Sequence, residues 1–596
     1  MRFLSKALDK SNLMMINVYY DKGSRDSTND DRLDFVYKDI DTGKTYVETI
    51  HNPMIEVYVA KPEYRVDYYK NFFSMDNCDK YTVHYKTRFK EIGDILGYSP
   101  QDTKFLPWVC QIDMEIEHFY MMQFFIEYDK HENYPLSLGF SDIESDIINF
   151  DDFAEPGEAP PNVISYFDEN TKDMYTLVCI QDNVPHVDES HKKYEYYEKL
   201  RARFKRQTED FINRMDEFKL ECERDFEPSY GKIDYHIFVF EDELSMSKAY
   251  WDIVHQCSND FLFFWNAPYD VSNLIERPYV KGVDPGSYIP SQEFGKRDVF
   301  WREDKNAIVH KRKHTFATYT TTVIMDQMVN YAGIRSGKGK LPTVRLNAIG
   351  KTELEDEKID YSEYGNIRMF PYYDWWKFVK YNIKDVLLQV GIERKTKDAQ
   401  YIYTMIRSNC LKSSEVFTST TVVGNSLRLF AIVEGREMMG QNKNKLFRVK
   451  KTAEQIKQEK KDKFAGAFVM HPKHATSTGH MLLGVLNRYI HDHGIDFDIT
   501  SEYPTGMLIM NCSNETMLGK VTLVDPDSID LPLHENMYFV DEDDKDGYRK
   551  TADKSNLMIE ALSENNPTAF GEQYFKLPGF SQIAEHIEDN IDDFIA

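Results

Sequence analysis

Two carboxylates end an apolar run in the first third of the chain. In "LSLGFSDIESDI", Asp142 and Glu144 follow residues that predict a buried strand. Residues two apart on a strand point to the same side, and converging carboxylates repel each other unless a cation lies between them. Mg²⁺ prefers such hard oxygen ligands. A second pair, Asp113 and Glu115 in "QIDMEIEHFY", is an alternative, and in so acidic a chain most such pairs lie in solvated turns.

Two later segments place further carboxylates at the ends of predicted elements. "DFLFFWNAPYDVSNLIER" is an apolar strand, followed by Asn266 and then by Asp270, which enters a predicted helix. "WWKFVKYNIKDVLLQV" predicts a helix on which Tyr381 and Asp385, four residues apart, share a face. Each fragment alone is common. Together, in the order strand, strand-to-helix and helix, they form a specific pattern.

The three motifs resemble the 3′→5′ proofreading exonuclease of DNA polymerases, an RNase H-like domain. The resemblance implies that Asn266 contacts DNA and that Tyr381 helps to position the attacking water. It also implies two divalent ions, Mg²⁺ or Mn²⁺ in its place, which activate that water and stabilise the leaving 3′ oxygen. The reaction would be hydrolysis of the terminal phosphodiester. The implied metal ligands are Asp142, Glu144, Asp270 and Asp385.

A fourth motif, "DITSEYPT", resembles the first palm motif of family B DNA polymerases. The resemblance makes Asp498 one of two catalytic metal-binding aspartates, with two ions at this site as well, and makes the backbone carbonyl of Ile499 a further ligand. Ser501 and Tyr503 would bind the incoming nucleotide, with Tyr503 beneath its sugar. Glu502 replaces the leucine of the family pattern, and its charge beside the nucleotide departs from that pattern.

The segment "KFAGAFV" resembles the element of the same family that contacts template DNA. Phe464 stands in place of tyrosine, while Gly466 and Ala467 match the small residues of that element. The lysine-rich stretch 443–463 directly precedes it, which favours lysines near phosphates. Phe464, Gly466 and Ala467 are therefore expected to bind DNA.

The resemblance extends from about residue 80 to 550 and is closest to polymerases of large tailed bacteriophages. "DMEIEHFYM" resembles the linker strand before the exonuclease in those proteins, so Asp113 and Glu115 are expected to be structural. The fingers motif K-x-x-x-N-S-x-Y-G and the second palm motif Y-x-D-T-D have no match in this sequence. The nearest candidate, "YFVDEDD", is better interpreted as a polar turn.

The sequence thus predicts an α+β, multidomain fold. A chain of 596 residues is too long for one core. Residues 190–225 are highly charged and predict a surface helix or an insertion. The expected parts are an N-terminal domain over 1–135, an RNase H-like 3′→5′ exonuclease over 136–400, a return to the N-terminal domain with a connector over 401–480, and a partial palm over 481–596.

Composition sets further bounds. Apolar residues make up 41% and aromatic residues 14%, which favours packed cores over disorder. Seven scattered cysteines without a C-x-x-C pair are typical of reduced thiols in a cytosolic compartment. No apolar run predicts a signal peptide or a membrane helix. The net charge of −26 disfavours nucleic-acid binding over the whole surface, but basic islands at 311–314 and 443–463 are local exceptions.

The resulting prediction is the N-terminal subunit of a split bacteriophage DNA polymerase, located in the cytoplasm of the infected host. Its expected partners are primer-template DNA, a single-stranded 3′ end, dNTP, a sliding clamp, and a second polypeptide that carries the fingers, the thumb and the rest of the palm. No membrane partner is expected. Three alternatives stay open: a stand-alone 3′→5′ exonuclease with an inert palm remnant, a non-catalytic replisome scaffold, and a piece of a longer polymerase. The intact carboxylate set favours an enzyme over a scaffold.

Overall fold

A computed structural model describes residues 9–24, 30–69, 72–129, 134–150, 154–305, 308–338 and 341–438. The chain divides into two compact units. The first comprises Met1–Ile55, Thr82–Arg88 and Met114–Glu434, and the second comprises Glu56–Tyr81, Phe89–Asp113 and Gly435–Ala596. Among the helices in the described ranges, none is both long and apolar enough to cross a membrane.

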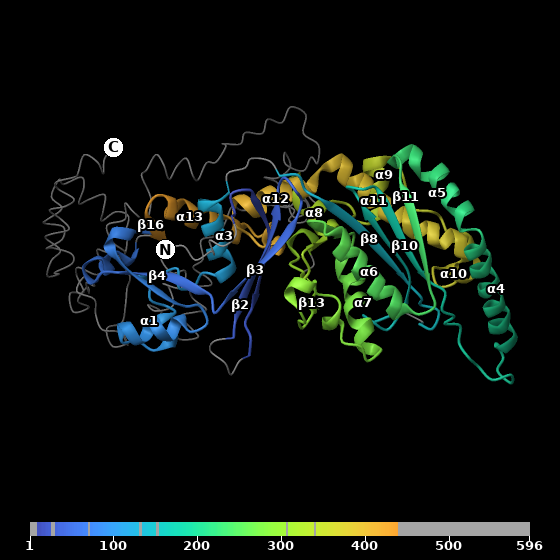
Figure 1. The fold of residues 1–596 in the computed structure, drawn as a ribbon, viewed down its shortest axis with the longest axis horizontal. Helices are drawn as coiled ribbons and strands as arrows, with labels where there is room; N and C mark the ends of the chain where they lie inside the picture. The colour runs from blue at the N-terminus through green and yellow to red at the C-terminus, as the bar shows by residue number, and fades with distance from the viewer. Residues whose placement is uncertain are drawn as a thin grey trace, which may run out of the picture. The chain divides into compact units, whose positions relative to one another are not determined.

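A six-stranded mixed sheet forms the centre of the first unit, with strand order β11-β10-β9-β8-β12-β15. Its strands β8, β10 and β11 are labelled in Figure 1. Strand β8 pairs antiparallel with β9 and parallel with β12, and β12 in turn pairs parallel with β15. Strand β10 is antiparallel to β9 and parallel to β11. The strands are β8 (Leu138–Ser145), β9 (Pro161–Asp168), β10 (Asp173–Cys179), β11 (Asp234–Phe240), β12 (Phe261–Phe264) and β15 (Val323–Asp326).

Helices cover both faces of this sheet. Successive side chains of a strand point to opposite faces, and in β12 the side chains on both faces are apolar and buried. Along β12, Leu262 and Phe264 pack with residues of α6 (Glu243–Cys257) and α7 (Ala267–Val280). Phe261 and Phe263 pack instead with residues of α11 (Trp375–Thr396) and α12 (Asp398–Ser408). Strand β12 is buried at every position, which explains why its sequence is a continuous apolar run.

Helix α11 is the long helix predicted by "WWKFVKYNIKDVLLQV". It begins after Asp374, whose side chain accepts a hydrogen bond from Lys377 N, and it ends at Lys397, which has a positive φ. The charged segment 190–225 lies largely in two helices, α4 (Tyr194–Asn213) and α5 (Met215–Tyr230), that pack against α11. The helix predicted there is therefore confirmed, and it supports α11.

The N-terminal strands β1 (Leu13–Asp21), β2 (Arg32–Asp39) and β3 (Thr45–His51) form an antiparallel sheet within the same unit. A buried contact ties this sheet to the six-stranded sheet. Lys38 Nζ lies 2.8 Å from Asp260 Oδ1, and Asp260 Oδ2 accepts a hydrogen bond from the backbone of Ser137. Because the ion pair is buried and hydrogen-bonded, loss of either partner would leave an uncompensated charge.

The segment "DMEIEHFYM" is not the strand expected from the resemblance. Helix α3 (Ile116–Glu127) begins inside it. Its buried residues include Ile116, Phe119, Tyr120 and Phe124, which follow helical rather than alternating spacing. The segment opens with alternating acidic and apolar residues, a pattern compatible with a strand, but the residues from Ile116 onward form a helix, so the strand expectation was wrong.

The second unit contains two small sheets, with strand orders β6-β4-β7 and β16-β5. Their strands are β4 (Met54–Ala60), β5 (Phe72–Ser74), β6 (Cys78–His84), β7 (Val109–Cys110) and β16 (Arg436–Met438). This unit also contains α2 (Pro100–Thr103) and most of α1 (Arg88–Leu96).

The described part of the first unit contains further strands and α-helices. They are β13 (Phe300–Arg302), β14 (Thr315–Ala317), α8 (Gln327–Arg335), α9 (Leu346–Leu354), α10 (Phe370–Tyr373) and α13 (Ser419–Val433).

Candidate active site

Three carboxylates meet where α11 crosses β8. Asp142 and Glu144 of β8 and Asp385 of α11 each offer an oxygen, and these oxygens all lie within 4.8 Å of one another. On β8 the residue between the two acids, Ile143, points into the core, so the acids project from the opposite face. Asp142 and Glu144 are half-buried, whereas Asp385 is buried. The spacing of both motifs therefore predicted the correct faces.

A fourth carboxylate, Asp270, lies in the first turn of α7. Its Oδ1 accepts a hydrogen bond from the backbone N–H of Ile143, at 3.2 Å. Burial raises the pKa of Asp270 well above its usual value, and the nearby charge of Asp142 raises it further. Asp270 therefore lies beside the group formed by β8 and α11, although it is not one of the three carboxylates whose oxygens lie within 4.8 Å of one another. Its role as a metal ligand, implied by the resemblance, stays a prediction.

Lys358 contacts this group and was not predicted. Its Nζ lies 2.6 Å from Asp385 Oδ2 and 3.2 Å from the hydroxyl of Tyr381, which shares a face of α11 with Asp385. Burial opposes the charge of Lys358, yet Asp385, Asp142 and Glu144 raise its pKa above the usual lysine value. The surrounding sequence, "ELEDEKID", has the composition of a solvated loop, so no signal in the sequence distinguishes this lysine.

Asn382 is the second residue that the sequence did not reveal. Its Nδ2 donates to Asp142 Oδ2 at 2.9 Å. About two turns further along α11, Gln389 Nε2 donates to the carbonyl oxygen of Ser141 at 3.2 Å. Both amides come from α11 and reach β8. They fix the position of the helix that carries Asp385 relative to the strand that carries Asp142.

The electrostatics of the site favour a bound cation. Burial and the neighbouring charge of Asp385 raise the pKa of Asp142 to about 8. Burial, followed by the charge of Asp142, raises the pKa of Glu144 well above its usual value. Burial also raises the pKa of Asp385, although Lys358 opposes this shift. One lysine therefore offsets the mutual repulsion of these carboxylates only in part.

The donor set fits divalent metal ions. Asp385 Oδ1 is buried and has no hydrogen-bond partner among the described residues. An unsatisfied buried carboxylate oxygen is costly, and a bound cation would satisfy it. All the donors are carboxylate oxygens, the ligands that Mg²⁺ and Mn²⁺ prefer. Asp142, Glu144, Asp270 and Asp385 are the residues that would hold such ions.

Two exposed side chains flank the N-terminus of α7. Asn266, which was predicted to contact DNA, is exposed, and its side chain makes no capping hydrogen bond with the helix. Tyr269 is 42% exposed although it directly precedes the buried Asp270. Both side chains are accessible to a ligand.

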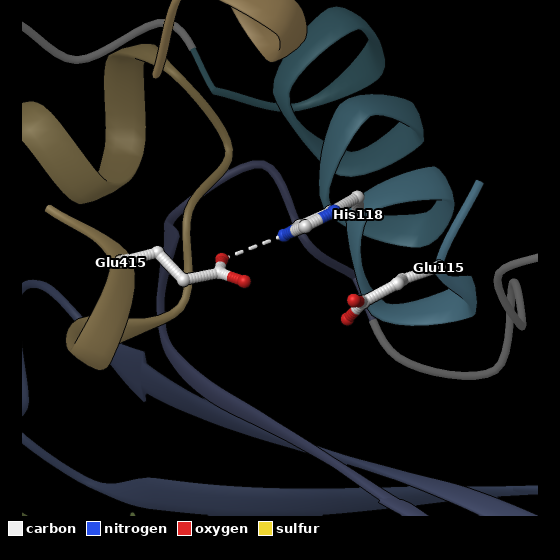
Figure 2. Close-up of side chains that lie close together, drawn as sticks. All are labelled: Glu115, His118 and Glu415. Carbon is white, nitrogen blue, oxygen red and sulfur yellow. Dashed lines mark hydrogen bonds and ion pairs between the residues drawn. The ribbon is translucent and has the colours of Figure 1, made fainter. Parts of the chain in front are cut away.

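A second group of possible metal ligands comprises Glu115, His118 and Glu415 (Figure 2). His118 Nε2 lies 2.8 Å from Glu415 Oε2. Lys412 forms an ion pair with Glu115, and its Nζ lies 3.7 Å from Glu415 Oε1 and 3.8 Å from Glu117 Oε1. Despite burial, the contacts with His118 and Lys412 hold the pKa of Glu415 below its usual value, whereas the pKa values of Asp142, Glu144 and Asp385 are raised. This group is therefore an ion-pair network, in keeping with the structural role expected for Glu115.

The other predicted site residues lie outside the described part of the chain. They are Phe464, Gly466, Ala467, Asp498, Ile499, Ser501 and Tyr503. Their roles in template, metal and nucleotide binding stay predictions.

Comparison with known proteins gives distant, partial similarity to viral DNA polymerases. The chain is 24% identical over 202 residues to a DNA polymerase of Choristoneura fumiferana nuclear polyhedrosis virus, which is 33% of this chain and 19% of that protein. It is 23% identical over 171 residues to a DNA polymerase of Orgyia pseudotsugata multicapsid polyhedrosis virus, or 29% of this chain and 17% of that protein. The chain thus spans less than a fifth of the length of either relative. No protein-family model matches the chain. Neither relative comes from a bacteriophage, so the phage assignment stays a prediction.

Proposed function

We propose that the chain is part of a viral DNA polymerase and carries its metal-dependent 3′→5′ exonuclease. The observation that carries this proposal is the meeting of Asp142 and Glu144 of β8 with Asp385 of α11. Asp270 of α7 lies beside them, bonded to the backbone of Ile143. Four carboxylates with one contacting lysine suit two divalent ions and a phosphodiester substrate. The similarity to DNA polymerases supplies the kind of substrate.

The site residues would divide the work of hydrolysis. Bound Mg²⁺ or Mn²⁺ would supply a water of lowered pKa and stabilise the leaving 3′ oxygen. Tyr381 accepts a hydrogen bond from Lys358, so its hydroxyl hydrogen can be donated to another acceptor in the site. Lys358 would offset negative charge as the phosphate enters. Asn266 and Tyr269, both exposed, would contact the terminal nucleotides.

The finer parts of the proposal rest on sequence motifs. The palm motif at Asp498 and the template motif at Gly466 support a polymerase active site that another polypeptide completes with fingers, thumb and a second aspartate. In this arrangement the chain is the N-terminal part of a split replicative polymerase of bacteriophage type. It would bind primer-template DNA, dNTP and a sliding clamp in the cytoplasm of an infected cell.

Digestion of single-stranded DNA by the purified chain tests the exonuclease. We expect Mg²⁺-dependent release of nucleotides from the 3′ end, and at least about a 100-fold loss in the Asp142→Asn/Glu144→Gln variant. The matched control is Glu115→Gln/Glu415→Gln, which neutralises two carboxylates of the other acidic group and should digest normally. A site variant that digests as fast as the native chain would refute the assignment.

Primer extension on the same samples separates the polymerase alternatives. The split arrangement predicts no extension by the chain alone and extension once the second polypeptide is added. If no polypeptide restores extension while digestion persists, the stand-alone exonuclease is favoured. Extension by the chain alone would contradict the split arrangement.

A further inference from the structure

We propose that Asp356 is a positioning residue, clasped between α5 and α11, that holds the loop from which Lys358 reaches the exonuclease site. Its effect on catalysis rests on the proposed function. Its effect on the placement of Lys358 does not, and the two can be measured separately.

The clasp consists of two side chains that converge on one carboxylate oxygen. Tyr230, the last residue of α5, donates its hydroxyl hydrogen to Asp356 Oδ2 at 2.7 Å. Lys384 of α11 donates to the same oxygen. Tyr230 is 5% exposed and Lys384 is 7% exposed, so neither contact is a flexible surface pair. The side chain of Asp356 is 28% exposed, so the clasp is half-buried, and a charge-assisted contact of this kind is stronger than a fully exposed ion pair.

Lys358, whose side chain enters the site, lies only two residues after the anchor, Asp356. Asp356 Oδ1 accepts a hydrogen bond from the backbone of Glu357 at 2.8 Å, and the backbone N–H of Lys358 donates to Asn347 Oδ1 at 2.8 Å. Glu355, which ends α9, has a φ of +56°, so the chain turns sharply just before the anchor. These contacts leave the loop little freedom between Asp356 and Lys358.

Helix α11 receives both ends of this short segment at adjacent residues. Lys384 holds Asp356, and Asp385 receives the ammonium group of Lys358 at 2.6 Å. The loop that carries Lys358 is therefore held by the same helix that carries Asp385, the carboxylate that Lys358 contacts. A shift of the anchor would move Lys358 relative to Asp385 and Tyr381, and small displacements in an active site have large effects on rate.

The first test measures the placement of Lys358 without any activity. Acetic anhydride labels accessible lysines, and peptide mass spectrometry reports the acetylation rate of Lys358 itself. We expect Asp356→Asn to raise that rate by about threefold or more, because the loop opens locally. Tyr230→Phe, which removes one hydrogen bond and keeps the ring, should raise it in the same direction by less.

Glu357→Gln is the matched control. It neutralises a carboxylate on the same loop, but Glu357 pairs with Lys351 at the surface, where both side chains are more than half exposed. Its Lys358 should be acetylated at the native rate. Unchanged acetylation of Lys358 in folded Asp356→Asn would overturn the proposal. If Asp356→Asn unfolds at a lower temperature because Lys384 has lost its partner, the acetylation rate of Lys358 in Tyr230→Phe is measured instead. An unchanged rate in that variant would also overturn the proposal.

The second test asks whether Asp356 acts through Lys358. We expect Asp356→Asn to lower kcat for single-stranded DNA roughly tenfold with little change in KM, as loss of a supporting contact does in other sites. In a Lys358→Met background the same substitution should have less than about a twofold further effect. Full additivity of the two substitutions would overturn the positioning role. A native chain that does not digest DNA would refute the proposed function, and the acetylation test would still decide the placement.

Discussion

Asn382 of α11 donates its side-chain amide to Asp142 Oδ2 of β8 at 2.9 Å, across 240 residues of sequence. An amide nitrogen can only donate, so this contact fixes one carboxylate oxygen of Asp142 and leaves the other for a different partner. Asn382 is fully buried, and the rest of α11 is held to β8 by Gln389. The contact therefore sets both the orientation of Asp142 and the distance between the two elements of the site.

Asn382→Ala should lower kcat for DNA digestion by roughly tenfold, because Asp142 loses the group that orients it. Asn425→Ala is a suitable control, since Asn425 is also a buried amide on a helix and donates to the carbonyl oxygen of Cys410, away from the site. Equal activity in the two variants would show that the Asn382 contact does not matter for the reaction.

Lys358→Met should reduce digestion by about 10- to 100-fold, because the phosphate would enter a site that has lost its contacting positive charge. Lys351→Met removes an exposed lysine that pairs with Glu357 and should leave the rate unchanged. Steady-state rates with and without elevated Mg²⁺ would check this. Native activity in Lys358→Met would exclude a role for the lysine in the reaction.

Mg²⁺ should stabilise the folded chain by relieving the repulsion among Asp142, Glu144, Asp270 and Asp385. Binding to one site at ten times its Kd adds about 1.4 kcal/mol to the free energy of unfolding. Chemical denaturation of the unit at several Mg²⁺ concentrations measures this increase. In Asp142→Asn/Glu144→Gln the increase should vanish, and an equal increase in both proteins would place the ion elsewhere.

Glu393 should make the stability depend on pH. Burial raises its pKa to about 8, from an ordinary value of 4.5. The folded chain therefore keeps a proton that the unfolded chain releases, and stability falls as pH rises from about 4.5 to 8. In Glu393→Gln the amide oxygen can still accept a hydrogen bond from Ala399 N. Relative to the native chain, this variant should gain up to a few kcal/mol in free energy of unfolding at pH 8.5 and nothing at pH 4. Denaturation curves at the two pH values check this, and parallel pH profiles of the two proteins would contradict it.

Gly391 allows α11 to pack closely beside Tyr230 and Leu354. A Cβ at this position would lie 2.7 Å from Leu354 Cδ1 and 3.0 Å from Tyr230 Cε1. Gly391→Ala should therefore lower the free energy of unfolding by about 1–3 kcal/mol. Gly337→Ala, where the added Cβ would meet nothing within 4 Å, should cause no such loss. A loss of equal size in both variants would mean that the close approach is not the cause.

The residues that could be located from the sequence share one property: their positions follow from local periodicity. Asp142 and Glu144 lie on one side of a strand, and Tyr381 and Asp385 on one side of a helix, as their spacing predicted. Lys358 could not be found in this way, because a sharp turn and contacts with distant residues bring it to the site. The error at α3 has another cause, because the alternation of acidic and apolar residues from Asp113 to Glu117 is compatible with a strand, whereas the residues from Ile116 onward form a helix.

The separation between Asp142 and Asn382 also governs when the site can exist during synthesis. Strands β8 and β9 are neighbours in the chain and can pair as soon as both have left the ribosome. The helix that completes the site follows 240 residues after Asp142. At about 5–20 residues per second, the carboxylates of β8 wait roughly 10 to 50 seconds for their partners. During that interval the nascent chain carries only part of a charged site, and the carboxylate group is complete only after α11 has been made.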